Sequence, residues 1–141
     1  MLLDVNALLL PVRTRFPLEA EVDRIRPGAR LAVPSSVVDE LGSLVTREVV
    51  GARGAFALAQ KFPVLAVAGR GDAAILGAAV RHGAWVVTAD RTLAERLRRK
   101  GVNVLVPRDR HRLELHPGNV PAASPPPTGP RAKPARRRQR L

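Results

Sequence analysis

The sequence predicts an α/β fold built around a parallel sheet, and three observations support this. Short apolar segments alternate with longer segments of helical spacing through residues 1–115. The apolar segments consist mainly of Val, Leu and Ala without polar alternation, which is typical of parallel strands covered on both faces. Signals for the start or end of a helix stand between them. We therefore expect about five short strands with helices on both sides.

The N-terminal elements are indicated by apolar pairs and by the positions of prolines. Leu2-Leu3 predicts a short strand that ends at Asp4. A helical turn is expected over residues 6–10, ended by Pro11. A second helix is expected over residues 17–26, because it begins with a proline and continues with apolar residues on one helical face.

The rest of the domain alternates strand and helix, with recognisable caps. Ser36 followed by Asp39 fits the capping-box pattern and predicts a helix start at Ser36. Gly83 and Gly101 are expected to end helices, since glycine favours the left-handed conformation found there. We expect strands at residues 30–33, 64–67, 84–88 and 102–106, and helices at residues 36–47, 51–61, 72–81 and 90–100.

The charge balance points to a polyanionic partner. The chain of 141 residues carries 24 Lys and Arg against 12 Asp and Glu, a net charge of +12. Cysteine is absent, which excludes disulfides and thiolate sites, and aromatic residues make up only 3%, which argues against a base-stacking platform. No segment has the roughly 18 apolar residues of a membrane span, and no signal peptide is evident. We expect a cytoplasmic protein with no membrane partner.

The C-terminal segment differs in composition from the rest of the chain. Residues 116–141 hold seven of the 13 prolines and six basic residues, with no acidic residue. Such a segment cannot bury enough apolar surface to offset the entropy of ordering it. We expect one folded domain over residues 1–115 and a disordered basic tail over residues 116–141.

One acidic residue follows each of the first four predicted strands. Asp4 ends the first strand, and Asp90 lies two residues beyond the fourth. Glu40 and Asp72 lie in the first turns of the helices after the second and third strands. Because sites in open α/β sheets form at the carboxyl ends of the strands, we expect the four acids to gather at one edge. A divalent cation such as Mg²⁺ or Mn²⁺ would relieve their mutual repulsion.

Each of these acids also has a structural interpretation. Asp4 could begin a turn, Asp90 could cap a helix, and Asp72 could stabilise a helix N-terminus. A second capping box at residues 92–95 makes Asp90 unnecessary as a cap. The coincidence of four acids at one sheet edge favours a functional site over four separate structural roles.

Helical phase separates two adjacent acids on the third helix. The apolar residues of that helix define a buried stripe, and Glu40 borders it at about 100° per residue. Asp39 points away from the stripe. We therefore assign Asp39 to capping and Glu40 to the site.

Two other motifs compete with the acid cluster. Residues 69–74 match a relaxed dinucleotide-binding fingerprint, but Asp72 would place a negative charge beside the pyrophosphate. This interpretation also leaves Asp4 and Glu40 unexplained, so no nucleotide cofactor is expected. The histidines show no ligand spacing and are expected at the surface: His82, His111 and His116.

Four stretches of the sequence resemble the PIN-domain nucleases. They are LLDVNALLLP at residues 2–11, VPSSVVDEL at 33–41, GDAAIL at 71–76 and VVTADRTL at 86–93. Pro11, VPSSV and the segment GVNVLVPR at 101–108 are similar to the archaeal branch related to the small-subunit rRNA-processing endonuclease.

The resemblance implies a three-layer α/β/α fold with strand order 3-2-1-4-5, which places the first and fourth strands side by side. We expect Asn6 and Thr88 to support the site, Asn6 by hydrogen bonding to Asp4 or to the phosphate. The catalytic and metal-binding residues that the resemblance implies, for Mg²⁺ or Mn²⁺, are Asp4, Glu40, Asp72 and Asp90.

The resemblance and the charge together imply metal-dependent cleavage of RNA phosphodiester bonds, in rRNA processing or ribosome biogenesis. The expected partner is RNA, in particular an rRNA precursor, and a homodimer is left open. A VapC-type toxin ribonuclease and a non-catalytic RNA-binding assembly module are the alternatives. The basic residues expected to contact the RNA backbone are Arg91, Arg96, Arg99 and Lys100 on the last helix, and Arg136, Arg137 and Arg138 in the tail.

Overall fold

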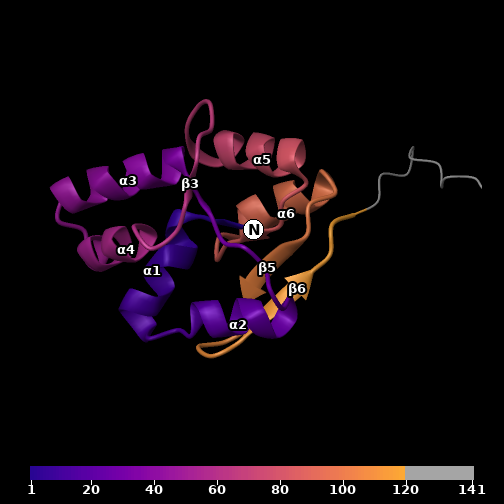
Figure 1. The fold of residues 1–141 in the computed structure, drawn as a ribbon, viewed down its shortest axis with the longest axis horizontal. Helices are drawn as coiled ribbons and strands as arrows, with labels where there is room; N and C mark the ends of the chain where they lie inside the picture. Colours follow the sequence, from indigo (N-terminus) through magenta and orange to yellow (C-terminus); the bar gives the residue numbers. More distant parts are fainter. Residues whose placement is uncertain (120–141) are drawn as a thin grey trace, which may run out of the picture.

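The computed structural model describes residues 1–119, which form a mixed α/β domain (Figure 1). The tail predicted over residues 116–141 lies outside the described residues from residue 120 onward. The strands are β1 (Leu2–Leu3), β2 (Val33–Pro34), β3 (Val64–Leu65), β4 (Val86–Val87), β5 (Val104–Pro107) and β6 (Leu113–His116). The helices are α1 (Val5–Thr14), α2 (Leu18–Ile25), α3 (Ser35–Thr46), α4 (Ala52–Ala59), α5 (Gly71–His82) and α6 (Arg91–Arg99).

The sheet has the expected strand order, with one strand added at its edge. β1 pairs with β4, β4 with β5, and β2 with β3, all in parallel. A bridge between Leu2 and Ala32 joins the two parts, and the Leu3 amide donates to the Ala32 carbonyl at 3.1 Å. β6 then pairs with β5 in the antiparallel direction. Because β1 and β4 are neighbours, the residues that follow them are brought together.

The helices cover both sides of this sheet. Figure 1 shows α5 and α6 on one side of β5 and β6, and α2 on the other side, while α1, α3 and α4 pack against one another. The strands and the inner faces of the helices supply the core, in which Leu3, Leu8, Val87, Leu97 and Leu105 are completely buried. Burying each such side chain contributes roughly 1.5–3 kcal/mol to the stability of the fold. The packed core therefore fixes the positions at which the strands end.

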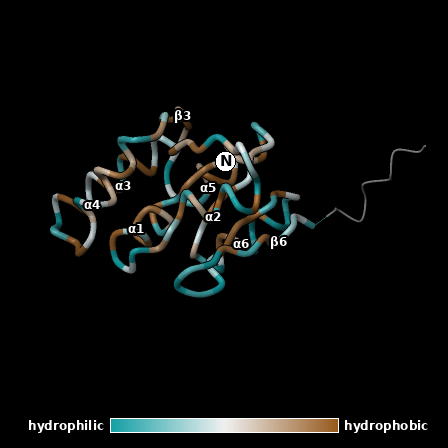
Figure 2. The backbone as a smooth tube through the Cα atoms, turned by 60° about the horizontal axis from the view of Figure 1, so that its bottom comes forward, coloured by the Kyte–Doolittle hydropathy of each residue, from teal (hydrophilic) through white to brown (hydrophobic). Residues whose placement is uncertain are grey.

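Hydropathy follows the same plan along the backbone. Figure 2 shows apolar segments running through the middle of the domain and hydrophilic segments in the connections, including the turn between β5 and β6 that projects at the bottom. In the part of the chain that the structure describes, no helix has the length and apolar character needed to cross a bilayer.

Pro11 does not end α1, so that prediction is wrong. The helix continues to Thr14, whose hydroxyl donates to the Leu10 carbonyl at 2.8 Å. A proline inside a helix costs about 3 kcal/mol because it removes a backbone hydrogen bond and crowds the preceding turn. Packing offsets this cost, since Val12 lies so close to Gly54 of α4 that a Cβ there would be 2.8 Å from a Val12 methyl group.

The start of α3 also differs from the prediction. The helix begins at Ser35, directly after Pro34, and no side chain caps it, so neither Ser36 nor Asp39 serves as a cap. The Ser35 hydroxyl instead accepts a hydrogen bond from the Val67 amide at 3.0 Å, beyond the end of β3. The buried Ser36 hydroxyl has no hydrogen-bond partner within residues 1–119.

β6 was not expected from the sequence. It is anchored by Glu21 of α2, a buried carboxylate that accepts from the Leu113 amide at 2.8 Å and from two nitrogens of Arg24 at 2.9 and 3.1 Å. Arg24 also donates to the Leu113 carbonyl at 2.9 Å. The hydrogen bonds from Arg24 hold the pKa of Glu21 below its ordinary value. This clamp ties the last strand to the first third of the chain.

Candidate active site

Asp4 is the buried centre of the candidate site. It follows β1, is only 3% exposed, and caps the N-terminus of α1. Its Oδ1 accepts a hydrogen bond from the Ala7 amide at 2.8 Å, and its Oδ2 accepts one from the Thr88 hydroxyl. Burial raises the pKa of Asp4 to about 6, the two hydrogen bonds oppose this rise, and the charges of Asp90 and Asp72 add to it. The Ala7 amide and the Thr88 hydroxyl therefore hold the Asp4 carboxylate in place, although the neighbouring acids repel it.

Thr88 connects Asp4 to Asp90. It follows β4, is completely buried, and donates its backbone N–H to the Leu105 carbonyl at 3.1 Å. Its hydroxyl donates to Asp4 and accepts from the Asp90 amide at 3.0 Å. The pairing of β1 with β4 allows this, and the Asp4 amide donates to the Val87 carbonyl at 3.3 Å. One side chain thus positions two of the expected site acids.

Asp90 caps α6, so the expectation that residues 92–95 make it unnecessary as a cap is wrong. Its Oδ1 accepts from the Thr92 and Leu93 amides at 2.9 and 3.1 Å. Thr92 lies inside the helix. Capping engages Oδ1 alone, so Oδ2 keeps its lone pairs for another ligand. The structural and functional interpretations of this residue are therefore compatible.

Asp72 lies in the first turn of α5 and is partly exposed. Because α5 follows the parallel strand β3, Asp72 lies at the same edge of the sheet as Asp4, and its charge adds to the rise in the pKa of Asp4. One of its carboxylate oxygens is 3.8 Å from a guanidinium nitrogen of Arg96 on α6, and both side chains are 41% exposed. Such an exposed pair contributes about 1 kcal/mol or less. Arg96, expected to contact RNA, here lies beside a site acid.

Glu40 lines a cavity of about 420 Å³ whose lining does not include Asp4. The structure does not separate Asp39 from Glu40 as helical phase predicts, because both residues are exposed and both line this cavity. Gly71, the first residue of α5, lines it too and precedes Asp72 directly, so the cavity reaches the acid edge. The lining residues are Ser36, Asp39, Glu40, Ser43, Arg70 and Gly71.

The acids do not form a ready-made metal cage. Within residues 1–119, no three Asp, Glu or His side chains are grouped closely enough to hold an ion. The donor set nevertheless fits a hard divalent cation, since carboxylate oxygens are its preferred ligands and the neighbouring charges already disfavour ionised Asp4. Asn6, expected to support the site, is exposed in the first turn of α1.

Comparison with known proteins identifies the family and the fold. A family model described as a PIN-like domain matches residues 1–110. The chain belongs to this family. The solved structure of the PIN domain endonuclease Utp24 is similar with a TM-score of 0.69 at 20% sequence identity, covering 85% of this chain and 94% of that chain. The structural likeness confirms the PIN fold. Among curated proteins no sequence matches.

The basic residues of α6 are spread along the PIN-like domain rather than gathered at the acids. α6 begins beside Asp90 and runs for nine residues, about 14 Å at 1.5 Å per residue. Arg91 is therefore near the acids, while Arg99 and Lys100 lie at the opposite edge of the sheet. The tail residues expected to bind RNA lie outside the described residues: Arg136, Arg137 and Arg138.

A basic turn that the sequence analysis did not single out lies at the acid edge. Residues 108–112 connect β5 to β6 and read Arg-Asp-Arg-His-Arg. β5 is parallel to β4, so its carboxyl end and this turn are at the same edge as Asp90. Asp109 orders the turn by accepting from the His111 and Arg112 amides at 2.8 and 3.0 Å. The sequence does contain a signal for this basic turn, namely three arginines directly after an apolar strand.

Proposed function

We propose that this PIN-like domain is an endoribonuclease whose chemistry takes place at the edge formed by Asp4, Asp72 and Asp90. The observation that carries the proposal is the hydrogen-bonded link from buried Asp4 through Thr88 to Asp90. Burial and the acidic neighbours both disfavour the charged form of Asp4, and a carboxylate kept at such a cost is typical of a catalytic or ligand-binding site. The family and the fold support a nuclease.

Asp4, Asp72 and Asp90 would hold a divalent cation, Mg²⁺ or Mn²⁺. Nucleases of the PIN family generally use divalent metals. When bound, such an ion neutralises charge on the scissile phosphate and lowers the pKa of the attacking water. Thr88 and the Ala7 amide orient Asp4 for this role, and Asp90 offers the carboxylate oxygen that capping leaves unused.

The substrate would lie between the acids and the basic groups at the same edge. Glu40 lines the adjoining cavity and would orient the attacking water or bind a second ion. Arg70 lines that cavity and Arg91 begins α6, so both can contact phosphates. The turn at residues 108–112 adds three guanidinium groups. These contacts are made to the phosphate backbone and do not read the bases. We therefore propose RNA as the substrate class and no particular sequence.

An rRNA precursor is the substrate that we propose, on the sequence similarity to the archaeal rRNA-processing branch. The test incubates the full chain with end-labelled precursor rRNA in EDTA, in Mg²⁺ and in Mn²⁺. Discrete cleavage in the presence of either ion and none in EDTA is expected. Tight binding without cleavage under all three conditions would contradict the proposal and favour an RNA-binding assembly module. Cleavage of unrelated structured RNA in preference to the precursor would contradict the rRNA assignment alone.

A further inference from the structure

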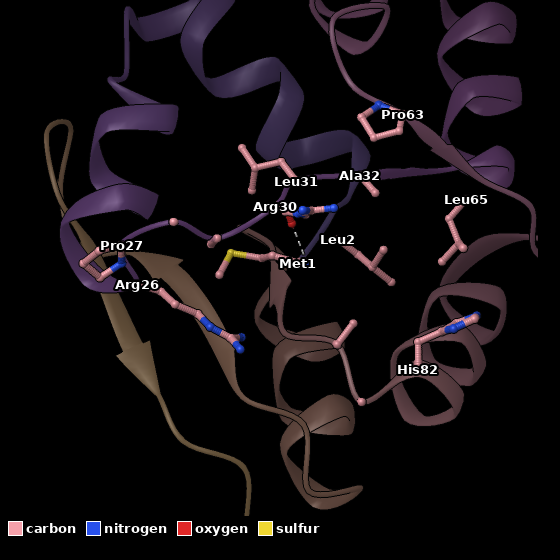
Figure 3. Close-up of a pocket in the computed structure, with 14 residues that line it drawn as sticks. Met1, Leu2, Arg26, Pro27, Arg30, Leu31, Ala32, Pro63, Leu65 and His82 are labelled. Atoms are coloured by element: carbon pink, nitrogen blue, oxygen red, sulfur yellow. Dashed lines mark hydrogen bonds between the residues drawn. The ribbon is translucent and has the colours of Figure 1, made fainter.

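A cavity lies at the edge of the sheet opposite the acids. It has a volume of about 670 Å³ and opens where the chain enters β1, β2, β3 and β4 (Figure 3). Its lining combines polar atoms with apolar side chains, which include Leu2, Ala32, Pro63 and Leu65. The apolar side chains can contact carbon atoms of a sugar or base.

The rim of this cavity is basic. Figure 3 shows Arg26 and Arg30, from the connection between α2 and β2, and His82, from the end of α5, placed around it. No Asp or Glu lines it, and within residues 1–119 no carboxylate lies within ion-pair distance of these three residues. The Arg26 guanidinium is fixed in place over the Trp85 ring, 4.2 Å from its centroid. The rim therefore carries positive charge that the described part of the chain does not neutralise.

A second cavity extends the basic surface along the same edge. It has a volume of about 160 Å³ and shares Gly83 and Ala84 with the first. Lys100 and Asn103 line it, again without an acid. We call the two cavities together the amino-edge groove. Its basic residues surround the first cavity and continue along the same edge to Lys100 in the second.

The C-terminal sequence continues from this groove. The Asn119 amide donates to the Arg98 carbonyl at 2.8 Å, and the Gly118 amide donates to the Asn103 side chain at 2.8 Å. The described chain thus ends beside the second cavity. The sequence that follows, residues 120–141, contains six basic residues and no acid. Further positive charge is therefore attached to the protein at this edge.

We infer that the amino-edge groove is a second RNA-contact surface, which binds the sugar-phosphate backbone of a single strand away from the cleavage edge. This inference rests on RNA being the substrate of the proposed function. Phosphates recur along a strand, which matches cations that are spread along the groove, and their counterions are released on binding. An acidic peptide is the competing occupant. The continuation of positive charge from the first cavity to Lys100 in the second favours a repeating phosphate backbone.

The test compares two double variants of the full chain. Arg30→Gln with Lys100→Gln removes two exposed groove cations, and the matched control Arg47→Gln with Arg53→Gln removes two exposed cations near the loop between α3 and α4. Fluorescence anisotropy measures binding of an unstructured RNA of about 20 nucleotides in EDTA, between about 50 and 200 mM salt. Binding in EDTA does not depend on cleavage, so the result stands whether or not the domain proves to be a nuclease.

The groove variant is expected to bind RNA several-fold more weakly than the control. Its salt slope should be shallower by about 0.7 for each lost phosphate contact, about 1.4 in total. Equal affinities and equal slopes for the two variants, with equal melting temperatures, would overturn the inference. Binding of labelled poly-glutamate is measured in parallel as a probe for an acidic peptide. If the groove variant lost poly-glutamate binding while its RNA binding stayed unchanged, the inference would be overturned and the groove would be assigned to an acidic protein.

Discussion

The two edges of the sheet differ in the residues that stand at their helix ends: acids at the carboxyl edge and bases at the amino edge. At the carboxyl edge, Asp4 and Asp90 cap the starts of helices, and Asp72 lies in a first helical turn. At the amino edge, Arg26 and Lys100 follow the ends of helices. In a sheet of parallel strands, the connecting helices begin at the carboxyl edge and end at the amino edge. Because acids are favoured at helix N-termini and bases at C-termini, this arrangement alone tends to place acids at one edge and bases at the other. What this general effect does not explain is burial: Asp4 is hidden, whereas the cations stay exposed.

The largest expected effect is at the acid edge. Asp90→Asn should lower metal-dependent RNA cleavage on the order of 100- to 1000-fold, since it removes a charge aimed at the reacting centre. Asparagine is as good a helix cap as aspartate, so α6 should remain intact. Single-turnover cleavage assays measure the loss, with Glu95→Gln on the same helix as the matched control. Equal cleavage rates for the two variants would show that cleavage does not take place at this edge.

The acid edge should also show a characteristic dependence of stability on pH. The pKa of Asp4 rises from an ordinary value of 3.8 to about 6 in the folded state, so the folded protein binds the extra proton. The free energy of unfolding should therefore fall by about 3 kcal/mol from this group as the pH rises from about 4 to above 6. Asp4→Asn should abolish that component.

Urea unfolding of both proteins at pH 4 and pH 7, without divalent ions, measures this component as the difference between them. Asp4→Asn should be the more stable protein at pH 7, and the advantage should disappear near pH 4. A constant difference across this range would show that the charge of Asp4 is not destabilising.

The next prediction concerns the amino edge. A chain that ends at Asn119 keeps the hydrogen bonds of Gly118 and Asn119 and loses six cations and no acid. It should fold normally, and the slope of log affinity for single-stranded RNA against log salt should be shallower by up to about 4. Circular dichroism checks the fold, and anisotropy at several salt concentrations gives the slope. An unchanged slope would remove the tail from RNA binding.

The smallest expected effect tests how Asp4 and Asp90 are joined. Thr88→Val leaves Asp4 without its hydroxyl donor and the Asp90 amide without its acceptor, which should cost about 1–3 kcal/mol of stability and slow cleavage. Thr88→Ser restores the hydroxyl and should recover cleavage. Full activity of the valine variant would show that the acids position themselves independently of Thr88.

The alternation of apolar and helical segments was sufficient to predict the strand–helix order and the edge on which Asp4 and Asp90 meet. Those features depend on local pattern and on the rule that parallel strands align their carboxyl ends. β6 could not be predicted in the same way, because Leu113–His116 become a strand only by pairing with β5 and by anchoring to Glu21. Neither contact leaves a periodic pattern in the sequence.

Local rules also failed where packing competed with them. Pro11 is a helix breaker by propensity, yet close contact between α1 and α4 keeps the helix continuous. Ser36 has the sequence of a cap, yet the turn from Pro34 begins the helix one residue earlier. Helical phase distinguished Asp39 from Glu40, but the cavity beside α3 is wide enough to include both.

The Glu21 clamp has a consequence for the order in which the chain can fold. Its carboxylate is 92 residues from the Leu113 amide, and Arg24 is 89 residues from the Leu113 carbonyl. During synthesis, α2 emerges long before these partners exist, so its carboxylate must stay hydrated until nearly the whole domain has left the ribosome. Contacts of such long sequence separation slow folding, because the loop must close before any contact forms. A nascent chain halted before Leu113 would leave α2 without its final attachment.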